Sequence, residues 1–502
     1  MGVIEKLKRL GIKGSTVIKT PSGPAAPTGC APDTKSIYRN RQNFGVNFGS
    51  LFVLEKFIFD ELFIDGTATE LDAITAFITA HGEDKTREVL ENHWKNYLTD
   101  EDWKWLKSNG ITAVRIPIGY WHINEGKFTE NTPFVNIASV YKSAWSIFKG
   151  LIENASQYQI GILVDLHALP GGANTADHSG CHLENPEFWS ERRYQELAVS
   201  VLEFISNEIQ QFENVIGLQI VNESIFDKNA DSQQHYYSKA IKQIRSIDSN
   251  IPIIISDGWW PDQWVKWINN SENNLKSHSG VVIDAHIYRC FSDSDRSKSP
   301  EQIIQDLDSD VLTNLSGVAD FIVGEYSCVL DGSSWDRSQH DRNELVKRYG
   351  NTLSKLFAER ANFGSFFWTF KFQHGDGGEW GFIPQVNSGN IIPLSNVVQR
   401  ESNEQEFKKI LSAELEVHSN YWEKQNKNEN YEHWRYQEGF TTAWVDSVEF
   451  SRFNGSRLGR VSAWKSSRRV EHIKNRHESK HLWEWDQGFD KGLEKAKQYL
   501  FD

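Results

Sequence analysis

Short apolar runs alternate with helix-type patterns along most of this 502-residue chain, and eight such runs predict an α/β fold, the (β/α)8 TIM barrel. The runs are nearly continuous in apolar residues, which is typical of parallel strands covered on both faces. In chain order the expected strands are residues 44–48, 112–117, 161–167, 215–222, 251–257, 281–286, 321–325 and 365–368. Residues 101–110 end on a glycine and residues 192–212 repeat apolar side chains every three or four positions, so both segments are expected to be helices.

Polar side chains at the ends of these runs are a further sign of a barrel. In such barrels the loops that follow the strands form one face, and the chemistry takes place there. The residues at or near the carboxyl ends of the expected strands are Arg115, His167, Asn222, Glu223, Asp257, His286, Glu325 and Trp368. A random scatter would place polar residues equally at the strand starts, so these positions predict a functional site.

Three parts are expected along the chain. Residues 1–42 are an N-terminal arm, extended from residue 14 because Gly, Pro, Ser and Thr are frequent there. Residues 43–400 form the catalytic barrel. Residues 401–502 form a Trp-rich helical extension packed on the barrel, and the similar stretches 434–440 and 483–489 predict a helical hairpin within it.

A basic stretch interrupts this extension between residues 452 and 476. Its cations are Arg457, Arg460, Lys465, Arg468, Arg469 and Lys474. Because the rest of the chain is acidic, we expect a solvated face or internal ion pairs here, and an RNA-binding patch is the alternative.

The overall charge argues against nucleic acid and anionic membranes as partners. The chain has 68 acidic and 54 basic residues, a formal net charge of -14, and so repels both at long range. A neutral substrate suits this charge better. Its 19 Trp, 15 Tyr and 29 Phe mostly pack a large core, but flat rings also stack against sugar faces.

The cysteines and the apolar segments bear on the compartment. Cys30, Cys181, Cys290 and Cys328 are scattered without a CxxC pair, so they predict reduced thiols rather than a zinc site or a disulfide framework. The N-terminus lacks the continuous apolar stretch of a secretory signal, and no run of about 18 apolar residues predicts a transmembrane helix. We therefore expect a cytoplasmic protein, and the sequence leaves its oligomeric state open.

Two apolar runs end in a glutamate, at Asn222-Glu223 and at Gly324-Glu325. A carboxylate at the rim of a core costs free energy unless chemistry or a partner offsets it. Two carboxylates that face one cavity can act as a protonated general acid and an ionised nucleophile, as cleavage of a glycosidic bond requires. This pair therefore predicts a glycosidase site.

Neighbouring residue types suggest which glutamate has which role. Glu223 fits the acid. Glu325 fits the nucleophile because Arg115 would favour its anion and Tyr288 could donate a hydrogen bond to it. With retention of configuration, the two carboxyl groups are expected about 5 to 5.5 Å apart.

Several longer motifs accompany the two glutamates. They are Gly45-Val-Asn-Phe-Gly49 with Val53-Leu-Glu55, Val114-Arg-Ile-Pro-Ile-Gly-Tyr-Trp121, Asp165-Leu-His-Ala-Leu-Pro-Gly-Gly172 with Asp177-His-Ser-Gly180, and His286-x-Tyr288-x-x-Phe291. Over residues 43 to about 380 their order and spacing resemble glycoside hydrolase family 5, in its fungal exo-β-1,3-glucanase branch. The tail and the N-terminus are more similar to the cytosolic glucan 1,3-β-glucosidase-like proteins of yeasts.

The resemblance implies roles for individual residues. Glu223 would be the acid/base and Glu325 the nucleophile, Arg115 would hold the nucleophile ionised, and Asn222 would bind the sugar 2-hydroxyl. The other implied contacts are His286 and Tyr288 beside the two carboxylates, Glu55, His167 and Asp177 on the other hydroxyls of a terminal glucose, Trp368 beneath its ring, and Phe291 against the leaving sugar. Ser224 stands where the family usually has proline, and the stretch around Trp380 also differs.

Together these features predict a retaining, exo-acting β-glucosidase that needs no metal or organic cofactor. It would release a terminal β-linked glucose from a β-1,3-glucan oligosaccharide or a related β-glucoside by double displacement. The alternatives are a β-glucosidase for a glucosyl lipid or a small-aglycone glucoside, a transglycosylase, and a catalytically silent carbohydrate-binding protein. No P-loop, dinucleotide fingerprint or HExxH motif competes with this hypothesis.

Overall fold

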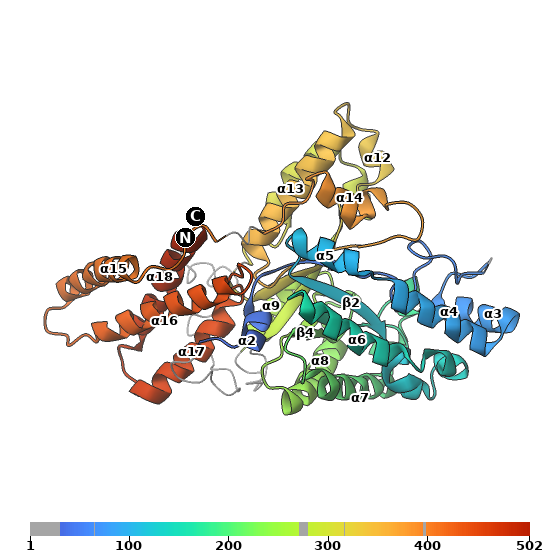
Figure 1. The fold of residues 1–502 in the computed structure, drawn as a ribbon, viewed down its shortest axis with the longest axis horizontal. Helices are drawn as coiled ribbons and strands as arrows, with labels where there is room; N and C mark the ends of the chain where they lie inside the picture. The colour runs from blue at the N-terminus through green and yellow to red at the C-terminus, as the bar shows by residue number, and fades with distance from the viewer. Residues whose placement is uncertain (1–30, 65, 271–279, 316, 395–397, 502) are drawn as a thin grey trace. The chain divides into compact units, whose positions relative to one another are not determined.

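The computed structural model describes residues 31–64, 66–270, 280–315, 317–394 and 398–501. They fall into two compact units (Figure 1). The first unit runs from Asn43 to Leu394, and the second joins residues 31–42 to residues 398–501.

The first unit is a closed barrel of eight parallel strands in chain order, which confirms the predicted fold class. The strands are β1 (Asn43–Asn47), β2 (Ala113–Gly119), β3 (Gly161–Ala168), β4 (Val215–Gln219), β5 (Ile253–Ser256), β6 (Val281–Ile287), β7 (Asp320–Tyr326) and β8 (Gly364–Phe367). Nearly every strand residue is buried, as the continuous apolar runs predicted. Because β4 is shorter than expected, Asn222 and Glu223 lie just beyond it.

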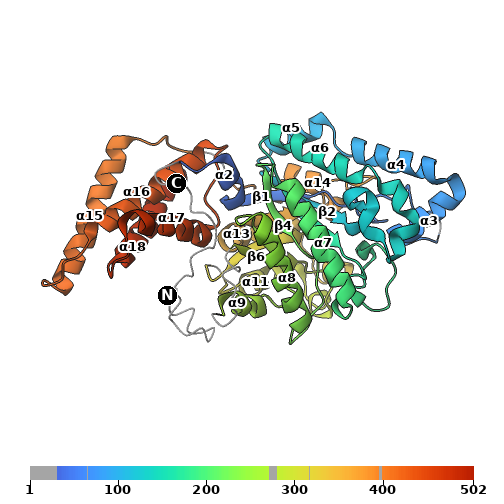
Figure 2. The same cartoon turned by 90° about the horizontal axis from the view of Figure 1, so that it is seen from below.

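Helices surround the strands, and the longer ones such as α6, α7 and α8 bury an apolar face. They are α3 (Glu70–His81), α4 (Glu83–Asn96), α5 (Asp100–Ser108), α6 (Ala144–Gln157), α7 (Arg192–Ile209), α8 (Asp231–Ile247), α9 (Pro261–Asn269), α10 (Asp293–Arg296), α11 (Pro300–Asp310), α12 (Gly332–Trp335), α13 (Arg342–Arg360) and α14 (Phe382–Asn387). Figure 2 shows α7 and α8 along the outer side of the strands. Short 3-10 segments complete the loops: η1 (Tyr120–Thr129), η2 (Pro133–Tyr141), η3 (Asp177–Ser179), η4 (Glu187–Trp189) and η5 (Gly378–Trp380).

Local sequence explains the ends of α5, one of the expected helices. Thr99 and Asp102 form a capping box at its start, which satisfies backbone N–H groups that the first turn leaves without partners. Gly110 follows its end with φ +75°, a conformation that glycine adopts without strain. The prediction that this helix ends at a glycine is therefore confirmed, with Gly110 two residues after the last helical residue.

Strand pairing becomes irregular near the carboxyl ends of the strands. The β6–β7 register shifts between Ala285 and His286, so that His286 pairs with Glu325. Such irregularities redirect side chains and are frequent beside active sites. Here the shift brings a histidine next to one of the two candidate carboxylates.

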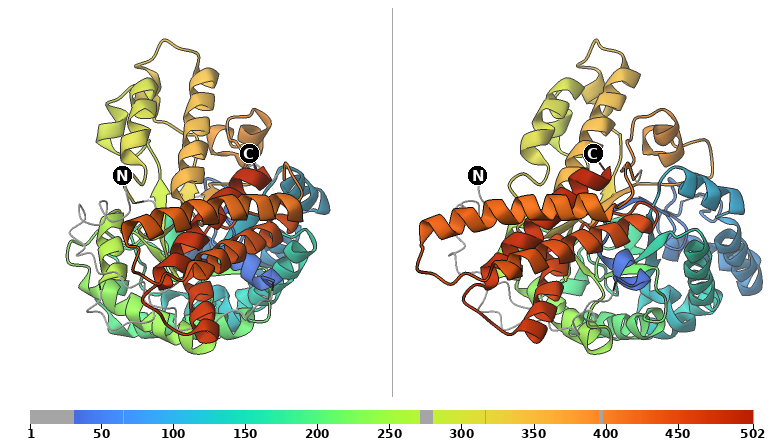
Figure 3. Two further views of the ribbon diagram at one scale, coloured as in Figure 1. Left: turned by 90° about the vertical axis from the view of Figure 1, so that its left-hand side faces the viewer. Right: turned by 60° about the vertical axis from the view of Figure 1, so that its left-hand side comes forward.

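The second unit is helical. Its helices are α2 (Thr34–Asn40), α15 (Glu404–Gln425), α16 (His433–Arg452), α17 (Val461–Arg476) and α18 (Leu482–Phe501), and Figure 3 shows the last four crossing one another. Ile37 of α2 packs with Trp464, Trp485 and Phe489 in one of its cores. The expected extended arm is thus wrong for residues 34–40, while residues 14–30 lie outside the described part of the chain.

The repeated stretches of the tail meet where α16 crosses α18. A Cβ on Gly439 would come within 2.2 Å of the Trp485 carbonyl oxygen, and one on Gly488 within 2.1 Å of the Tyr436 carbonyl oxygen. Each copy therefore supplies the glycine that lets the two backbones touch. The two helices do pair as predicted, but α17 lies between them in the chain, so they are part of a larger bundle and not a simple hairpin. That this bundle packs on the barrel stays a prediction.

The basic stretch makes internal ion pairs, the interpretation favoured by the acidic composition. Arg468 donates to Asp446 with Nε at 2.8 Å and Nη2 at 2.6 Å, and a third bond of 2.8 Å reaches Glu471. Lys465 lies 2.7 Å from Asp490. With the pair of Arg469 and Asp486, these contacts neutralise three of the six cations that an RNA-binding patch would need to expose. In the described parts of the chain no helix combines the length and apolarity of a membrane span.

Candidate active site

Most of the candidate residues gather at the carboxyl ends of the barrel strands. His167, His286 and Glu325 are each the last residue but one of their strands, β3, β6 and β7. Arg115 is the third residue of β2 and so lies nearer the start of its strand than expected. The others follow strand ends: Asn222 and Glu223 after β4, Asp257 after β5, and Trp368 after β8. Asp257 accepts a hydrogen bond from the Trp259 N–H at 2.9 Å and closes a turn, so it is not one of the paired carboxylates.

Arg115 is the fully buried centre of this cluster. Its Nη1 donates to Glu325 Oε1 at 2.9 Å, and its Nη2 donates to Asn222 Oδ1 at 2.7 Å. Further partners, each at 2.9 Å, are Asn47, Asp165 and Gln219. Burial alone would lower the pKa of Arg115, but the carboxylates of Asp165, Glu325 and Asp284 outweigh it and raise the pKa. The guanidinium is therefore a permanent cation with a fixed orientation beside Glu325.

The Glu325 carboxylate is held at both oxygens. Oε1 accepts from Arg115, and Oε2 accepts from the Tyr288 hydroxyl at 2.9 Å. Both contacts were predicted from the sequence. They leave the carboxylate little freedom to rotate, as suits a nucleophile that must attack along one direction.

His286 lies between the two glutamates. Its Nδ1 is 2.9 Å from Glu223 Oε1 and 3.5 Å from Glu325 Oε2, while its Nε2 is 3.0 Å from Asp284 Oδ2. One carboxylate oxygen of Glu223, one of Glu325 and a ring nitrogen of His286 all lie within 4.8 Å of one another. The two strand-end glutamates therefore meet in a single site.

The protonation states differ from the expectation. Burial would raise the pKa of Glu223, but the hydrogen bond and charge of His286, with help from His178, lower it to about 2. Burial raises the pKa of Glu325, although His286 and Arg115 oppose this. The pKa of His286 is raised well above its usual value because the charges of Glu325 and Asp284 outweigh its burial. These shifts favour a proton on His286 and an ionised Glu223 in the free site, and the role of Glu223 as the acid stays a prediction.

Two Asp-x-His pairs support the site, and their aspartates had no predicted role. His167 Nδ1 lies 2.6 Å from Asp165, and His286 Nε2 lies 3.0 Å from Asp284. Residues two apart in a strand point to the same face, so each aspartate can orient its histidine. The sequence signal that could have revealed them is an aspartate two residues before a histidine, which occurs in both apolar runs.

Three of the predicted sugar-binding residues, His167, Asn222 and Trp368, form one group. His167 Nε2 is 3.3 Å from Asn222 Nδ2, and the His167 ring lies parallel to Trp368, with an interplanar angle of 12° and centroids 6.2 Å apart. His178, a residue without a predicted role, places Nε2 3.5 Å from Glu223 Oε2. Backbone strain marks the same place, since Glu223 has φ +42°, a sparsely populated region that is common at functional sites.

Glu55 and Asp177 add two further carboxyl groups. Burial raises the pKa of Glu55 well above its usual value, and the charges of Glu325, Glu223 and Asp177 raise it further. These shifts favour the protonated form of Glu55, which can donate a hydrogen bond as well as accept one. Asp177 begins the short segment η3.

Aromatic rings lie beside Tyr288. Its ring centroid is 5.5 Å from that of Phe291 and 5.7 Å from that of Trp380, and Phe57 lies 6.4 Å from Trp380. Phe57 and Phe291 are 57% and 59% exposed, which is unusual for such large apolar side chains. Phe291 thus adjoins the site next to the residue that binds Glu325.

Ser224 shows why proline is not required after Glu223. Its backbone N–H donates to Ser256 Oγ at 3.0 Å, a bond that proline has no hydrogen to make. The serine at this position therefore anchors the loop to β5 by a hydrogen bond.

Comparison with known proteins agrees with this geometry. The family model for cellulase, glycosyl hydrolase family 5, matches residues 78–373. This chain belongs to glycosyl hydrolase family 5. A second model, the C-terminal domain of glucan 1,3-beta-glucosidase 3, matches residues 403–500. As a member of family 5, the chain is a glycoside hydrolase.

Relatives of this family-5 enzyme cover nearly its whole length. An uncharacterized glycosyl hydrolase of Saccharomyces cerevisiae is 41% identical over 488 residues, 95% of both chains. Glucan 1,3-beta-glucosidase 3 of Schizosaccharomyces pombe is 34% identical over 437 residues, 86% of this chain and 91% of that protein. Among solved structures, the rutinosidase of Aspergillus niger is similar in fold, with a TM-score of 0.56, 20% identity, and coverage of 70% of this chain and 98% of that one.

Proposed function

We propose that this enzyme is a retaining, exo-acting β-glucosidase that releases a terminal β-linked glucose from a β-1,3-glucan oligosaccharide or a related β-glucoside. The observation that carries the proposal is the approach of Glu223 and Glu325, whose carboxylate oxygens lie within 4.8 Å of each other. Retaining glycosidases hold their two carboxyl groups about 5 to 5.5 Å apart, whereas inverting enzymes need room for a water molecule. The named relative from Schizosaccharomyces pombe supports the substrate class.

In the first step Glu325 attacks the anomeric carbon and the leaving oxygen takes a proton from Glu223. Arg115 and Tyr288 hold the attacking carboxylate, each through a bond of 2.9 Å. Since His286 carries the proton in the free site, Glu223 and His286 act together as the acid: His286 passes its proton to Glu223 across 2.9 Å as the glycosidic bond breaks.

In the second step water attacks the glycosyl ester on Glu325. Esterification removes the negative charge of Glu325, and the loss of a like charge lowers the pKa of Glu223. The Glu223 carboxylate then accepts the proton of the attacking water, helped by the nearby imidazoles, and the second displacement restores the original configuration.

The remaining site residues bind the glucose that is released. Asn222 is fixed by Arg115 and would meet the 2-hydroxyl, where hydrogen bonds strengthen in the transition state. His167, Glu55 and Asp177 would bind the other hydroxyls, and Trp368 would stack beneath the ring. These roles suit a neutral sugar because each of these groups can exchange hydrogen bonds with hydroxyls.

A second candidate function has a specific observation in its favour. The exposed Phe57 and Phe291 both contact Trp380, and Tyr288 contacts Phe291 and Trp380, so that the four rings form an aromatic surface beside Glu325. Rings of this kind bind a second sugar by stacking, and they also bind the apolar part of a glucosyl lipid or aryl glucoside. A sugar held there could replace water in the second step, which would make the enzyme a transglycosylase.

We further propose that the enzyme works in the cytoplasm. Cys181, Cys290 and Cys328 are buried free thiols. Unpaired thiols are typical of reducing compartments.

The test is a hydrolysis screen with aryl β-glucoside, laminari-oligosaccharides and glucosyl lipids, with NMR detection of the anomer first released. We expect β-glucose from the non-reducing end, and no turnover by Glu325→Gln. Glu223→Gln should slow poor leaving groups by about 10²- to 10⁴-fold and good ones far less, because only the poor ones need a proton in the first step. Release of α-glucose, equal losses on both substrates, or an inactive wild type that still binds sugar would each refute this mechanism.

A further inference from the structure

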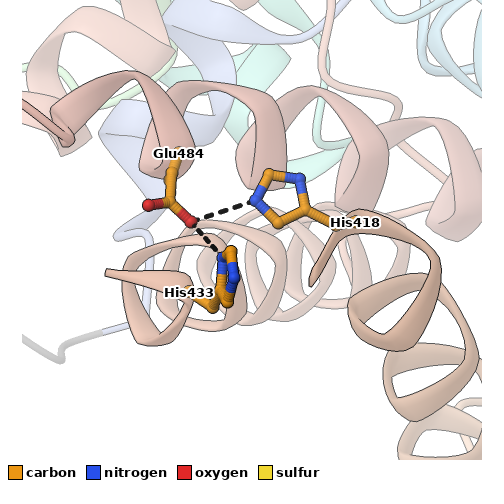
Figure 4. A group of neighbouring side chains, drawn as sticks. All are labelled: His418, His433 and Glu484. Carbon is orange, nitrogen blue, oxygen red and sulfur yellow. Dashed lines mark hydrogen bonds and ion pairs between the residues drawn. The ribbon is translucent and has the colours of Figure 1, made fainter. Parts of the chain in front are cut away.

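The helical unit contains a cluster of three metal-binding side chains that the hydrolase reaction does not use. His418 comes from α15, His433 is the first residue of α16, and Glu484 lies in the first turn of α18 (Figure 4). Each of three helices thus supplies one residue. We propose that His418, His433 and Glu484 bind a divalent transition metal ion, zinc in the first instance, that fastens these helices together.

The donor atoms already have nearly the spacing of a coordination shell. Glu484 Oε2 is 3.0 Å from His418 Nε2 and 2.7 Å from His433 Nδ1, and all three atoms lie within 4.8 Å of one another. Zinc binds imidazole nitrogen and carboxylate oxygen at about 2.0 to 2.2 Å, so ligand atoms around a tetrahedral ion are roughly 3.3 Å apart. In Figure 4 both rings present a nitrogen to the same carboxylate oxygen. Small side-chain rotations would therefore place an ion between them.

The charge of this cluster favours a cation. The side chain of Glu484 is 0% exposed, and its ion-pair partners among the described residues are histidines, not lysine or arginine. The Glu432 N–H also donates to its Oε1 at 2.7 Å. A divalent ion would therefore add positive charge beside a buried carboxylate that has no lysine or arginine partner among the described residues.

Groups around the cluster could support the histidines as outer residues do in metal sites. His433 Nε2 points away from the cluster, makes no hydrogen bond within the described residues and lies 3.7 Å from Glu423 Oε1. A small turn of the ring toward an ion would let this nitrogen donate to Glu423, as in carboxylate–histidine–metal arrangements, where the bond makes the inner nitrogen a better ligand. The His418 ring stacks on Tyr436 with centroids 4.0 Å apart, which fixes its plane.

A third histidine supplies an independent indication. His481 Nε2 is 3.0 Å from Glu429 Oε1, and its buried Nδ1 makes no hydrogen bond within the described residues, although it lies 3.8 Å from Glu484 Oε1. This nitrogen lies on the side of Glu484, while the other ring nitrogen is held by the Glu429 carboxylate. His481 and Tyr431 also line a hollow of about 520 Å³.

The first experiment uses the full-length wild-type enzyme. After removal of metal with a chelator, zinc is titrated calorimetrically at neutral pH, and thermal unfolding is measured with and without zinc. We expect about one zinc ion bound per chain and a rise of several degrees in the midpoint of unfolding. If zinc does not bind and the midpoint of unfolding does not change, the proposal is overturned, and the three side chains form only a hydrogen-bonded network.

Variants then locate the ion. His418→Gln and His433→Gln keep a hydrogen-bond donor toward Glu484 but should lose zinc, whereas Glu423→Gln should weaken zinc binding by about 10- to 100-fold. His477→Gln alters an exposed histidine of the same unit and should bind zinc as the wild type does. If zinc is retained by both cluster variants, or is lost in His286→Gln instead, the ion is bound elsewhere and the proposal fails.

Discussion

His286 is the residue whose replacement tests the mechanism most directly. In His286→Gln an amide replaces the imidazolium that lies between Asp284 and the two glutamates. Glutamine can still donate a hydrogen bond, but it carries no proton that can be transferred. The change therefore removes the proposed proton reservoir and keeps part of the hydrogen bonding.

The structure gives the size of the effect. The pKa of Glu223 is about 2 instead of 4.5, and the largest influences that lower it are the hydrogen bond and the charge of His286. A difference of about 2.5 pKa units corresponds to about 3 kcal/mol in favour of the Glu223 anion. Without His286, burial and the charge of Glu325 should raise the pKa of Glu223, so that this glutamate holds its own proton.

The pH profile of kcat/KM on a substrate with a poor leaving group is the assay. Activity falls as pH rises through the pKa of the group that must be protonated. In the wild type that group is His286, with a pKa well above 6.5, so the basic limb lies above that pH. In His286→Gln the limb should move to lower pH, to the pKa of Glu223, and activity at neutral pH should fall accordingly.

His178→Gln is the matched control. His178 also approaches Glu223, at 3.5 Å, but burial lowers its pKa, so it is neutral near pH 7 and holds no proton for catalysis. This variant should keep the wild-type basic limb. An unchanged limb in His286→Gln, or an equal shift in both variants, would refute the assignment of the proton to His286.

Three further predictions follow from packing and contacts. Arg115→Lys should reduce kcat/KM by at least about 10²-fold on good and poor leaving groups alike, because lysine cannot hold Glu325 and Asn222 together; an effect confined to poor leaving groups would contradict this. Gly439→Ala should lower the free energy of unfolding by about 1 to 3 kcal/mol in a denaturant titration, because the new methyl group would come within 2.2 Å of a carbonyl oxygen. The control is Gly150→Ala in α6, where the methyl group would meet no atom within 4 Å, and this change should be neutral or stabilising. Phe291→Ala should raise KM for laminari-oligosaccharides with little effect on a small aryl glucoside, and Phe226→Ala, at an equally exposed phenylalanine, should change neither value.

Much of the barrel was predictable because its signals are local. Strands covered on both faces need continuous apolar runs, and the interruptions by Arg115, His286 and Glu325 stand out against them. The approach of Glu223 to Glu325 was also predictable, because the carboxyl ends of all strands in a closed parallel barrel lie on one face.

Which of Glu223, His286 and Glu325 holds a proton was not predictable from residue types. It depends on His286, which lies 2.9 Å from Glu223 but 3.5 Å from Glu325, and on the way burial and like charge act on Glu325. Such balances follow from distances of a few ångströms, which motif spacing does not contain.

The amino-acid order thus established the closed barrel, the pair of glutamates and the arginine beside them, because each leaves a mark within a short stretch of chain. Folding alone brought His418, His433 and Glu484 together, from helices whose sequence spacing matches no metal motif, and it placed Gly439 and Gly488 at one helix crossing. These features depend on contacts between distant segments. Only the packed structure sets such contacts, since the energies of ligands, charges and close approaches change over fractions of an ångström.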